Sequence, residues 1–307
     1  MLTALLIILP IFLVIGLGVF LRWREFVTPD GSKALSRFVF RIAAPLYLLR
    51  SIGSKPISES AHFETIVIIV GVTVLTAAVT YLASRGQSRQ RIGVMAQGSF
   101  RSNTFFFGLP VVTQAYGDAA VSQAAVIIGT MVITYNLLGA LVLVLPRQRM
   151  SARSTKLWIE TVSDMVRNPL VLAILGGIAL SSSGSIIPEA IDRTLEMVGR
   201  TALPLALLSI GVGLDPRHLP LEWRASLVIS MIKLVIYPAA IWWALRAIGL
   251  EGDALRIPVV LLSSPCAIMS YIMVKEMSGD EQLASAFVIG TTLMSVVTSV
   301  GWLVFLG

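Results

Sequence analysis

Cysteine and histidine are nearly absent from this sequence of 307 residues, which contains Cys266, His62 and His218 and no others of these two types. A single cysteine excludes an internal disulfide and a metal site built from several thiolates. The two histidines fall far apart in predicted loops, so a histidine-based metal site is not expected. We therefore predict a protein that uses no metal and no cofactor.

Charged residues are also scarce, at 13% of the chain, whereas hydrophobic residues make up 56%. A soluble chain carries about 25% charged residues. The surplus apolar residues are therefore expected to meet lipid, in a protein that crosses the membrane many times. The net charge of +7 does not indicate a nucleic-acid partner. The basic residues lie mostly between apolar blocks, where such residues determine membrane topology.

Ten apolar segments are long enough to cross a bilayer core, which takes roughly 20 residues per helix. The connecting segments leave no room for a soluble domain, so residues 1–307 are predicted to form a single membrane domain. The first segment has neither a basic n-region nor a small-residue cleavage site, so it is expected to remain as a span. The predicted spans are residues 2–21, 33–53, 63–84, 91–115, 119–145, 168–183, 191–213, 223–246, 255–277 and 281–306, of which the fourth, seventh and ninth are broken.

Lysine and arginine are unevenly divided between alternate loops. The loops that follow the first, third, fifth, seventh and ninth spans carry 14 of them, and the other loops carry four: Lys55, Arg193, Arg246 and Arg256. Basic loops stay in the cytoplasm. We therefore expect both termini outside, which agrees with an even number of spans.

Two apolar stretches contain residues that a lipid-facing helix avoids. The second stretch, residues 263–275, reads SSPCAIMSYIMVK. Membrane helices that are broken at corresponding places in two halves indicate a transporter's substrate site at the bilayer midplane. The unfavourable residues of the first stretch, residues 98–117, are Arg101, Ser102, Asn103, Gly108 and Pro110.

The sequence also contains an internal echo. Residues 41–49, RIAAPLYLL, match residues 200–208, RTALPLALL, at an arginine, an alanine, a proline and three leucines. The constant offset maps the second span onto the seventh, so the chain divides into repeats of about 1–146 and about 157–307. Five spans per repeat make the second copy enter from the opposite face. Pro45 and Pro204 are expected to kink their spans.

The two breaks together suggest a binding site. If the chain unwinds near residues 102–105 and 264–267, the two crossings can meet, and half-helix N-termini there offer free N–H groups to an anion. Asn103 can instead be a helix-packing residue. The residues predicted to bind substrate at these breaks are Ser102, Asn103, Thr104, Ser264, Pro265 and Cys266.

Three further polar residues lie at membrane depth, and each has two interpretations. Arg101 either pairs with an anionic substrate or extends to the cytoplasmic surface. Lys233 lies near the midplane. In a functional role it substitutes for a coupling cation or carries a proton. In a structural role it forms a static ion pair or a bond to broken-helix carbonyls. Asn136 either lines the same cavity or makes a polar packing contact. No Asp or Glu stands out at the midplane, which weakens the case for a sodium site built on carboxylates. The energy source remains open between proton coupling, uniport and sodium coupling.

At these residues the sequence resembles the auxin efflux carrier family, which contains plant auxin carriers and many bacterial transporters. The resemblance runs end to end. In the plant carriers a proline precedes the asparagine of the fourth span, where this sequence has Ser102. The matching pieces are Asn103-Thr-x-x-x-Gly108-x-Pro110, Ala115-Tyr116-Gly117, Asn168-Pro169, Pro265 and Lys275-Glu276.

The resemblance implies an all-α fold of ten transmembrane helices, arranged as two inverted five-helix repeats with broken helices 4 and 9 that cross. It implies that spans 1, 2, 6 and 7 form a scaffold, which dimerises in many members. Spans 3–5 and 8–10 would form a transport domain that moves like an elevator. The implied substrates are organic anions, such as indole acids or dicarboxylates like malonate.

From these observations we expect a carrier of a small organic anion in the cell (cytoplasmic or inner) membrane, with lipid around it. The rival class is an anion channel or a non-transporting membrane sensor. A channel would show a continuous polar stripe, whereas the polarity here is concentrated at one depth. An enzyme is not expected, because the spans contain no Ser/His set, paired Asp or metal-ligand set.

Overall fold

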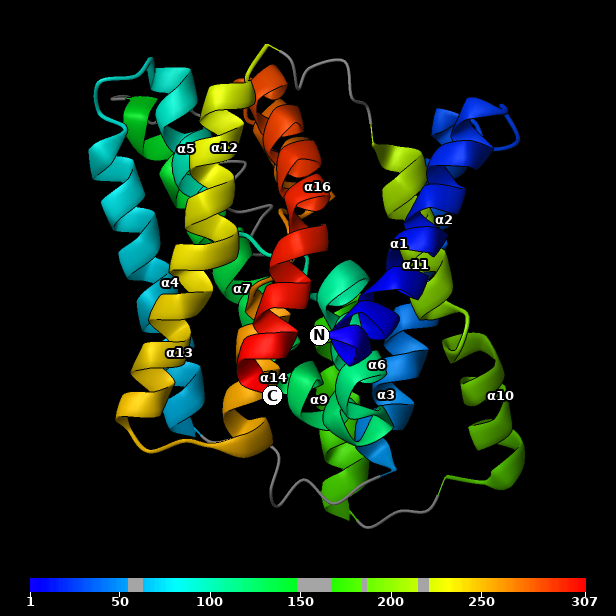
Figure 1. Ribbon diagram of the computed structural model, residues 1–307. Helices are drawn as coiled ribbons and strands as arrows, with labels where there is room; N and C mark the ends of the chain where they lie inside the picture. Colours follow the sequence, from blue (N-terminus) through cyan, green and yellow to red (C-terminus); the bar gives the residue numbers. More distant parts are fainter. Residues whose placement is uncertain (55–62, 148–166, 184–186, 215–220) are drawn as a thin grey trace.

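The computed structural model describes residues 1–54, 63–147, 167–183, 187–214 and 221–307. These residues are helical and contain no β-strand. The helices form two groups that stand side by side (Figure 1). His62, His218 and Lys55 lie outside the described residues, as does residue 157, where the second repeat is predicted to begin.

The first helix group lies at the right and lower centre of Figure 1, where α6 (Leu109–Tyr116) of the other group lies beside it, and it combines segments from both halves of the chain. Within it, α1 packs against α11, and α3 packs against α9 and α10. The ion pairs of Arg50 with Asp192 (2.7 Å) and Glu196 (3.1 Å) join α3 to α10. Its elements are α1 (Leu2–Trp23), α2 (Pro29–Phe38), η1 (Val39–Ala43), α3 (Ala44–Gly53), α9 (Pro169–Ser183), α10 (Glu189–Gly199) and α11 (Ala202–Gly213).

The second helix group contains the remaining elements, again from both halves. Here α12 packs against α16, α4 against α5 and α13, and α5 against α7. Its elements are α4 (Phe63–Ala83), α5 (Arg89–Phe100), η2 (Thr104–Gly108), α6 (Leu109–Tyr116), η3 (Asp118–Ala120), α7 (Val121–Val144), η4 (Leu145–Arg147), α12 (Trp223–Met231), η6 (Ile232–Ile236), α13 (Tyr237–Ala247), α14 (Gly252–Leu262), α15 (Ile268–Glu276) and α16 (Glu281–Leu306).

Six helical stretches of the described chain are long and apolar enough to cross a membrane, and Pro169–Ser183 is a shorter apolar helix. The predicted breaks of the fourth, seventh and ninth spans are confirmed, between α5 and η2, α10 and α11, and α14 and α15. The six stretches are Leu2–Trp23, Phe63–Ala83, Asp118–Val144, Glu189–Gly213, Trp223–Ala247 and Glu281–Leu306.

Three π-helical turns interrupt the α-helices, and each ends two residues before a proline. The turns η1, η2 and η6 precede Pro45, Pro110 and Pro238. A proline inside an α-helix lacks its N–H and clashes with the carbonyl four residues earlier. The wider turn moves that carbonyl away, so the helix continues past the proline. The irregularity expected at Pro45 therefore takes the form of a π turn, and Pro204 follows the short break at residues 200–201.

Glycines allow α1 and α11 to approach each other closely. A Cβ atom added to Gly18 would lie 3.0 Å from the Cα of Gly211 and 3.1 Å from the backbone nitrogen of Val212. Near the same crossing, Arg22 donates hydrogen bonds to the carbonyls of Val212 (3.0 Å) and Leu214 (2.7 Å). These bonds satisfy carbonyls that the end of α11 leaves without intrahelical donors.

An ion-pair cluster gathers three helix starts at one end of the second group. Arg91 of α5 pairs with Glu222 before α12 (2.6 Å) and with Asp280 before α16 (3.3 Å). The hydrogen bonds from Arg91 hold the pKa of the Glu222 carboxyl below its ordinary value. The loops that carry these three residues were predicted to share one side of the membrane, and they lie together.

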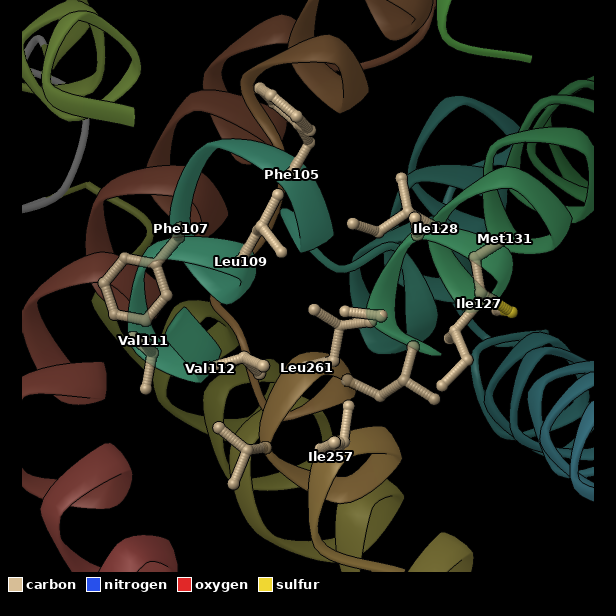
Figure 2. Close-up of a cluster of buried hydrophobic side chains, with 14 of the residues drawn as sticks. Phe105, Phe107, Leu109, Val111, Val112, Ile127, Ile128, Met131, Ile257 and Leu261 are labelled. Atoms are coloured by element: carbon tan, nitrogen blue, oxygen red, sulfur yellow. The ribbon is translucent and has the colours of Figure 1, made fainter. Parts of the chain in front are cut away.

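A buried apolar cluster packs around η2, α6, α7 and α14 (Figure 2). The side chains come from segments far apart in the sequence, including Phe105, Val112, Ile128 and Leu261, each at most 4% exposed. This cluster holds the two broken helices against α7 and thereby fixes the position of the breaks.

The glycine contact between α1 and α11 predicts opposite effects for two matched substitutions. Gly18→Ala should lower the unfolding free energy by about 1–3 kcal/mol, because the added methyl group overpacks the crossing. Gly16→Ala, where nothing lies within 4 Å of the added Cβ, should leave stability equal or higher by up to about 1 kcal/mol. Thermal unfolding in detergent measures both. Equal melting temperatures for the two variants would contradict the close packing.

Candidate functional site at the crossing of the two broken helices

The two breaks lie against each other in the centre of the second helix group. Residues 101–103 separate α5 from η2, and residues 263–267 separate α14 from α15. The backbone nitrogen of Asn103 donates to the carbonyl of Pro265 (2.8 Å), and that of Ala267 donates to the carbonyl of Arg101 (3.2 Å). These two bonds form an antiparallel bridge centred on Ser102 and Cys266. The predicted meeting of the two breaks is confirmed.

Side chains of neighbouring elements complete the backbone pairing. The Ser102 hydroxyl donates to the carbonyl of Leu262, the last residue of α14 (2.8 Å). The backbone nitrogen of Cys266 donates to Oγ1 of Thr291 in α16 (2.9 Å), and the Cys266 thiol donates to the carbonyl of Gly98 (3.1 Å). In a bilayer, unwound backbone persists only where such partners are supplied.

A glycine makes the close crossing possible. A Cβ added to Gly108 would lie 2.6 Å from the Ser264 hydroxyl oxygen and 2.9 Å from the carbonyl of Leu261. The Ser264 hydroxyl itself donates to that carbonyl (2.6 Å) and is 1% exposed. Ser264 therefore supports the crossing through its hydrogen bond to α14. Pro265 supports it through its backbone carbonyl, which accepts from Asn103.

Asn103 presents an unpaired amide at this crossing. The residue is 7% exposed, its amide atoms are not fully buried, and its side chain forms no hydrogen bond with any residue that the structure describes. The neighbouring Thr104 is also buried, at 4% exposure, and begins η2. The first N–H groups of a helix have no intrahelical acceptor. The start of η2 therefore combines the Asn103 amide with backbone donors.

Arg101 does not extend to the surface. The residue is 5% exposed, and its guanidinium donates to the carbonyl of Tyr135 (2.9 Å) and to Oδ1 of Asn136 (2.9 Å), both in α7. Of the two interpretations of Asn136, the geometry gives a polar contact with Arg101. No carboxylate of the described chain pairs with Arg101.

Lys233 lies in the π turn η6 and is fully buried. Its ammonium donates to the carbonyl of Leu262 (2.8 Å), the same atom that accepts from Ser102, and lies 4.8 Å from the ring centre of Tyr237. Of the predicted alternatives, this geometry is the bond to a broken-helix carbonyl. Within the described residues Lys233 also lacks a carboxylate partner, so two buried cations flank the crossing.

Three residues near the crossing were not predicted from the sequence. Thr291 accepts the backbone donor of Cys266. Tyr237 shares a hydrogen bond with Thr73 of α4 (2.8 Å). The buried hydroxyl of Tyr135 lies near those of Ser102 and Tyr237 and meets neither with hydrogen-bond geometry in the described structure. Isolated Thr and Tyr residues are common in apolar helices, so the sequence gives no signal for them.

The membrane helices, their paired breaks and the buried cations are features of solute transporters. Residues 3–303 match the family described as "Membrane transport protein". The chain belongs to this family. It is therefore an integral membrane protein of a transporter family and not an enzyme, and the family includes auxin efflux carriers.

Similar proteins within this family come from archaea, bacteria and plants. An uncharacterized transporter of Methanocaldococcus jannaschii is 23% identical over 305 residues, which cover 96% of each chain. A "Putative malonate transporter" of Rhizobium meliloti is 24% identical over 303 residues, 97% of this chain and 94% of the relative. Auxin efflux carrier component 8 of Arabidopsis thaliana is 19% identical over 351 residues, 95% and 94% of the two chains.

The bond between Cys266 and Thr291 predicts a difference between two adjacent threonines. Thr291→Val leaves the buried N–H of Cys266 without an acceptor, which should cost about 1–3 kcal/mol. Thr292 is also buried, at 3% exposure, and its hydroxyl bonds only to the carbonyl of Val288 in its own helix. Thr292→Val should therefore cost less. Thermal unfolding of both variants in detergent tests this, and an equal loss would argue against a supporting role for Thr291.

Proposed function

We propose that this chain is a secondary carrier of a small organic anion, which binds where the two broken helices cross. Asn103, Thr104 and the start of η2 would donate hydrogen bonds to the anion, and Ser102, Ser264, Pro265 and Cys266 would shape the opposite wall. Arg101, held by Asn136, and Lys233 would supply positive potential.

The observation that carries this proposal is the Asn103 amide, which has no hydrogen-bond partner among the described residues, beside two buried cations that have only neutral partners. Buried charges are normally paired with an opposite charge. An anion at the crossing would satisfy the Asn103 amide. It would also offset part of the cost of burying Arg101 and Lys233. The neutral partners of both cations therefore favour an anionic substrate over a cationic one.

The wider architecture that we propose is ten spans in two inverted repeats with both termini outside. Supporting it, both halves contain a π turn or break near the aligned Arg41 and Arg200, and both contain a broken helix at the crossing. The clustering of Arg91, Glu222 and Asp280 agrees with the assignment of their loops to one side. The greater number of basic residues there favours the cytoplasm.

We further propose that the first helix group is the scaffold, able to dimerise, and that the second group moves as an elevator. Apolar side chains meet between the groups: Phe12 of α1 and Phe107 of η2 lie edge to face with ring centres 5.7 Å apart. The Ser122 hydroxyl donates to the carbonyl of Ser51 across the same boundary (3.1 Å). Apolar contact is non-directional, so such a boundary tolerates sliding better than an ion-pair network would.

The substrate class that we propose to test first is a dicarboxylate such as malonate. One relative is named for malonate and another for auxin, and both names describe carboxylate compounds. A channel or a sensor is the alternative. The polar groups at the crossing are at most 7% exposed, which favours alternating access over an open pore. Proton coupling, uniport and sodium coupling would each be compatible with this site.

Proteoliposomes test the carrier directly. Purified protein should give saturable uptake of radiolabelled malonate and counterflow when unlabelled malonate is preloaded. Uptake that stays linear with concentration, together with ohmic current, would identify a channel. Absence of any flux with a panel of mono- and dicarboxylates, while ligand binding persists, would identify a sensor.

Asn103→Ala should reduce uptake by about tenfold or more, because a buried hydrogen bond to a charged group contributes about 1.5–3 kcal/mol. Gln114→Ala on the exposed side of α6 is the matched control and should keep wild-type uptake. Carboxylates should raise the melting temperature of wild-type protein and of the control more than that of Asn103→Ala. Equal ligand stabilisation of all three proteins would remove Asn103 from the site.

Lys233→Met separates a transport role from a structural one. The substitution removes a buried charge and keeps most of the side-chain volume, so stability should be unchanged or higher. Transport should fall because the positive potential at the crossing is lost. Lys275→Met, at an exposed position on α15, is the control. A large fall in stability with normal transport per folded molecule would assign Lys233 to capping Leu262 alone.

A further inference from the structure

A cavity lies away from the crossing, at the end of the second helix group opposite Arg91. It occupies about 580 Å³ between the end of α13, the start of α14 and the end of α16. Figure 1 shows the C-terminal end of the chain beside α14. This volume falls within the range of about 300–1,000 Å³ typical of small-molecule sites. The lining residues include Trp242, Arg246, Glu251, Leu255, Arg256 and Phe305.

The cavity is amphipathic. Trp242 and Phe305 stack edge to face with ring centres 5.1 Å apart and form an aromatic wall with Leu255. Arg246 and Arg256 bring positive charge to the same space. Aromatic side chains with adjacent cations mark the depth at which lipid headgroups meet a membrane protein.

The charges leave an anion-binding capacity that the described chain does not use up. Arg246 pairs with Glu251 (2.7 Å), but the two side chains are 51% and 70% exposed, so this pair is weak. Arg256 is half-buried and forms neither an ion pair nor a hydrogen bond with any described residue, although its guanidinium lies beside Gly307 and its charge acts on Tyr116. The cavity also contains Gly252, at the start of the 11-residue helix α14, where the N-cap residue Glu251 provides no side-chain hydrogen bond and Asp253 lies in the first turn.

The position of these arginines is unusual for this end of the protein. The loops on this side carry only four basic residues, and two of them, Arg246 and Arg256, line one cavity. Of the other two, Arg193 pairs with Glu189 four residues away on the same helix. Under the proposed topology these loops lie outside, where Lys and Arg are less frequent, so two arginines at one cavity are unusual there.

We propose that this cavity binds the phosphate of an anionic phospholipid. The phosphate would lie between Arg246 and Arg256, near the start of α14, and the first part of an acyl chain would contact Trp242 and Phe305. The planar guanidinium of arginine matches the geometry of a phosphate, and aromatic side chains lie at the depth of the lipid headgroups. A bound lipid would link α13, α14 and α16 and so stabilise the end of the helix that leads into the crossing.

Detergent-purified full-length protein tests the proposal with phosphatidylglycerol, phosphatidylcholine of the same acyl chains, and inorganic phosphate. In native mass spectrometry the protein should retain phosphatidylglycerol in preference to phosphatidylcholine. Phosphatidylglycerol should also raise the unfolding temperature more than phosphatidylcholine does. Arg246→Gln and Arg256→Gln should each weaken phosphatidylglycerol binding by about fivefold, since each removes a hydrogen bond to the phosphate that contributes about 1 kcal/mol. Arg193→Gln, at the same end but outside the cavity, should bind as the wild type does.

Equal retention of the two lipids, or equal binding by all variants, would overturn the proposal. Stabilisation by millimolar inorganic phosphate as large as that by phosphatidylglycerol would identify a free-anion site and overturn the lipid assignment. If Arg256→Gln fails to fold, Arg246→Gln decides, because Arg246 is exposed and its removal leaves the core intact. None of these outcomes depends on transport at the crossing.

Discussion

Two backbone hydrogen bonds, between residues 101 and 267 and between residues 103 and 265, are the contact on which the rest of the structure depends. Each break leaves peptide groups that lipid does not satisfy, and each break supplies the partner that the other lacks. Neither unwound segment is therefore stable alone. The glycine at position 108, the hydroxyls of Ser102 and Thr291 and the apolar cluster of Figure 2 all serve to bring the two segments into register.

The same crossing explains why two cations are tolerated at depth. Arg101 and Lys233 donate to carbonyls that helix ends or helix surfaces expose, at 2.8–2.9 Å, rather than to carboxylates. Carbonyl dipoles stabilise a cation without cancelling its charge. The interior of the second helix group therefore keeps a positive character, which a protein of a transporter family can use to attract an anion.

Part of this arrangement could be predicted from the sequence. Asn103, Pro265 and the polar residues around them broke the apolar pattern, so both breaks and their meeting were predicted. The contacts of Arg101 and Lys233 were left between alternatives, because a backbone carbonyl such as that of Tyr135 or Leu262 has no signature in the sequence. Thr291 and the cavity beside Arg256 were not predicted for a related reason, because only tertiary packing shows which residues of distant helices face each other. The second span was predicted as a continuous helix with a kink, and the structure has a π turn at residues 39–43 instead. This turn relieves the clash between Pro45 and a backbone carbonyl, and apolar periodicity does not encode it.

The π turns before Pro45, Pro110 and Pro238 have a consequence for where charge points. Each such turn contains one residue more than an α-helical turn, and one residue corresponds to about 100° of rotation around the helix axis. Lys233 sits inside one of these turns, at residues 232–236. Deleting a single residue from the turn before Lys233 would leave the hydropathy of the helix almost unchanged. It would nevertheless rotate the ammonium of Lys233 away from the carbonyl of Leu262. Helical phase, and not only residue type, thus fixes the direction of this cation.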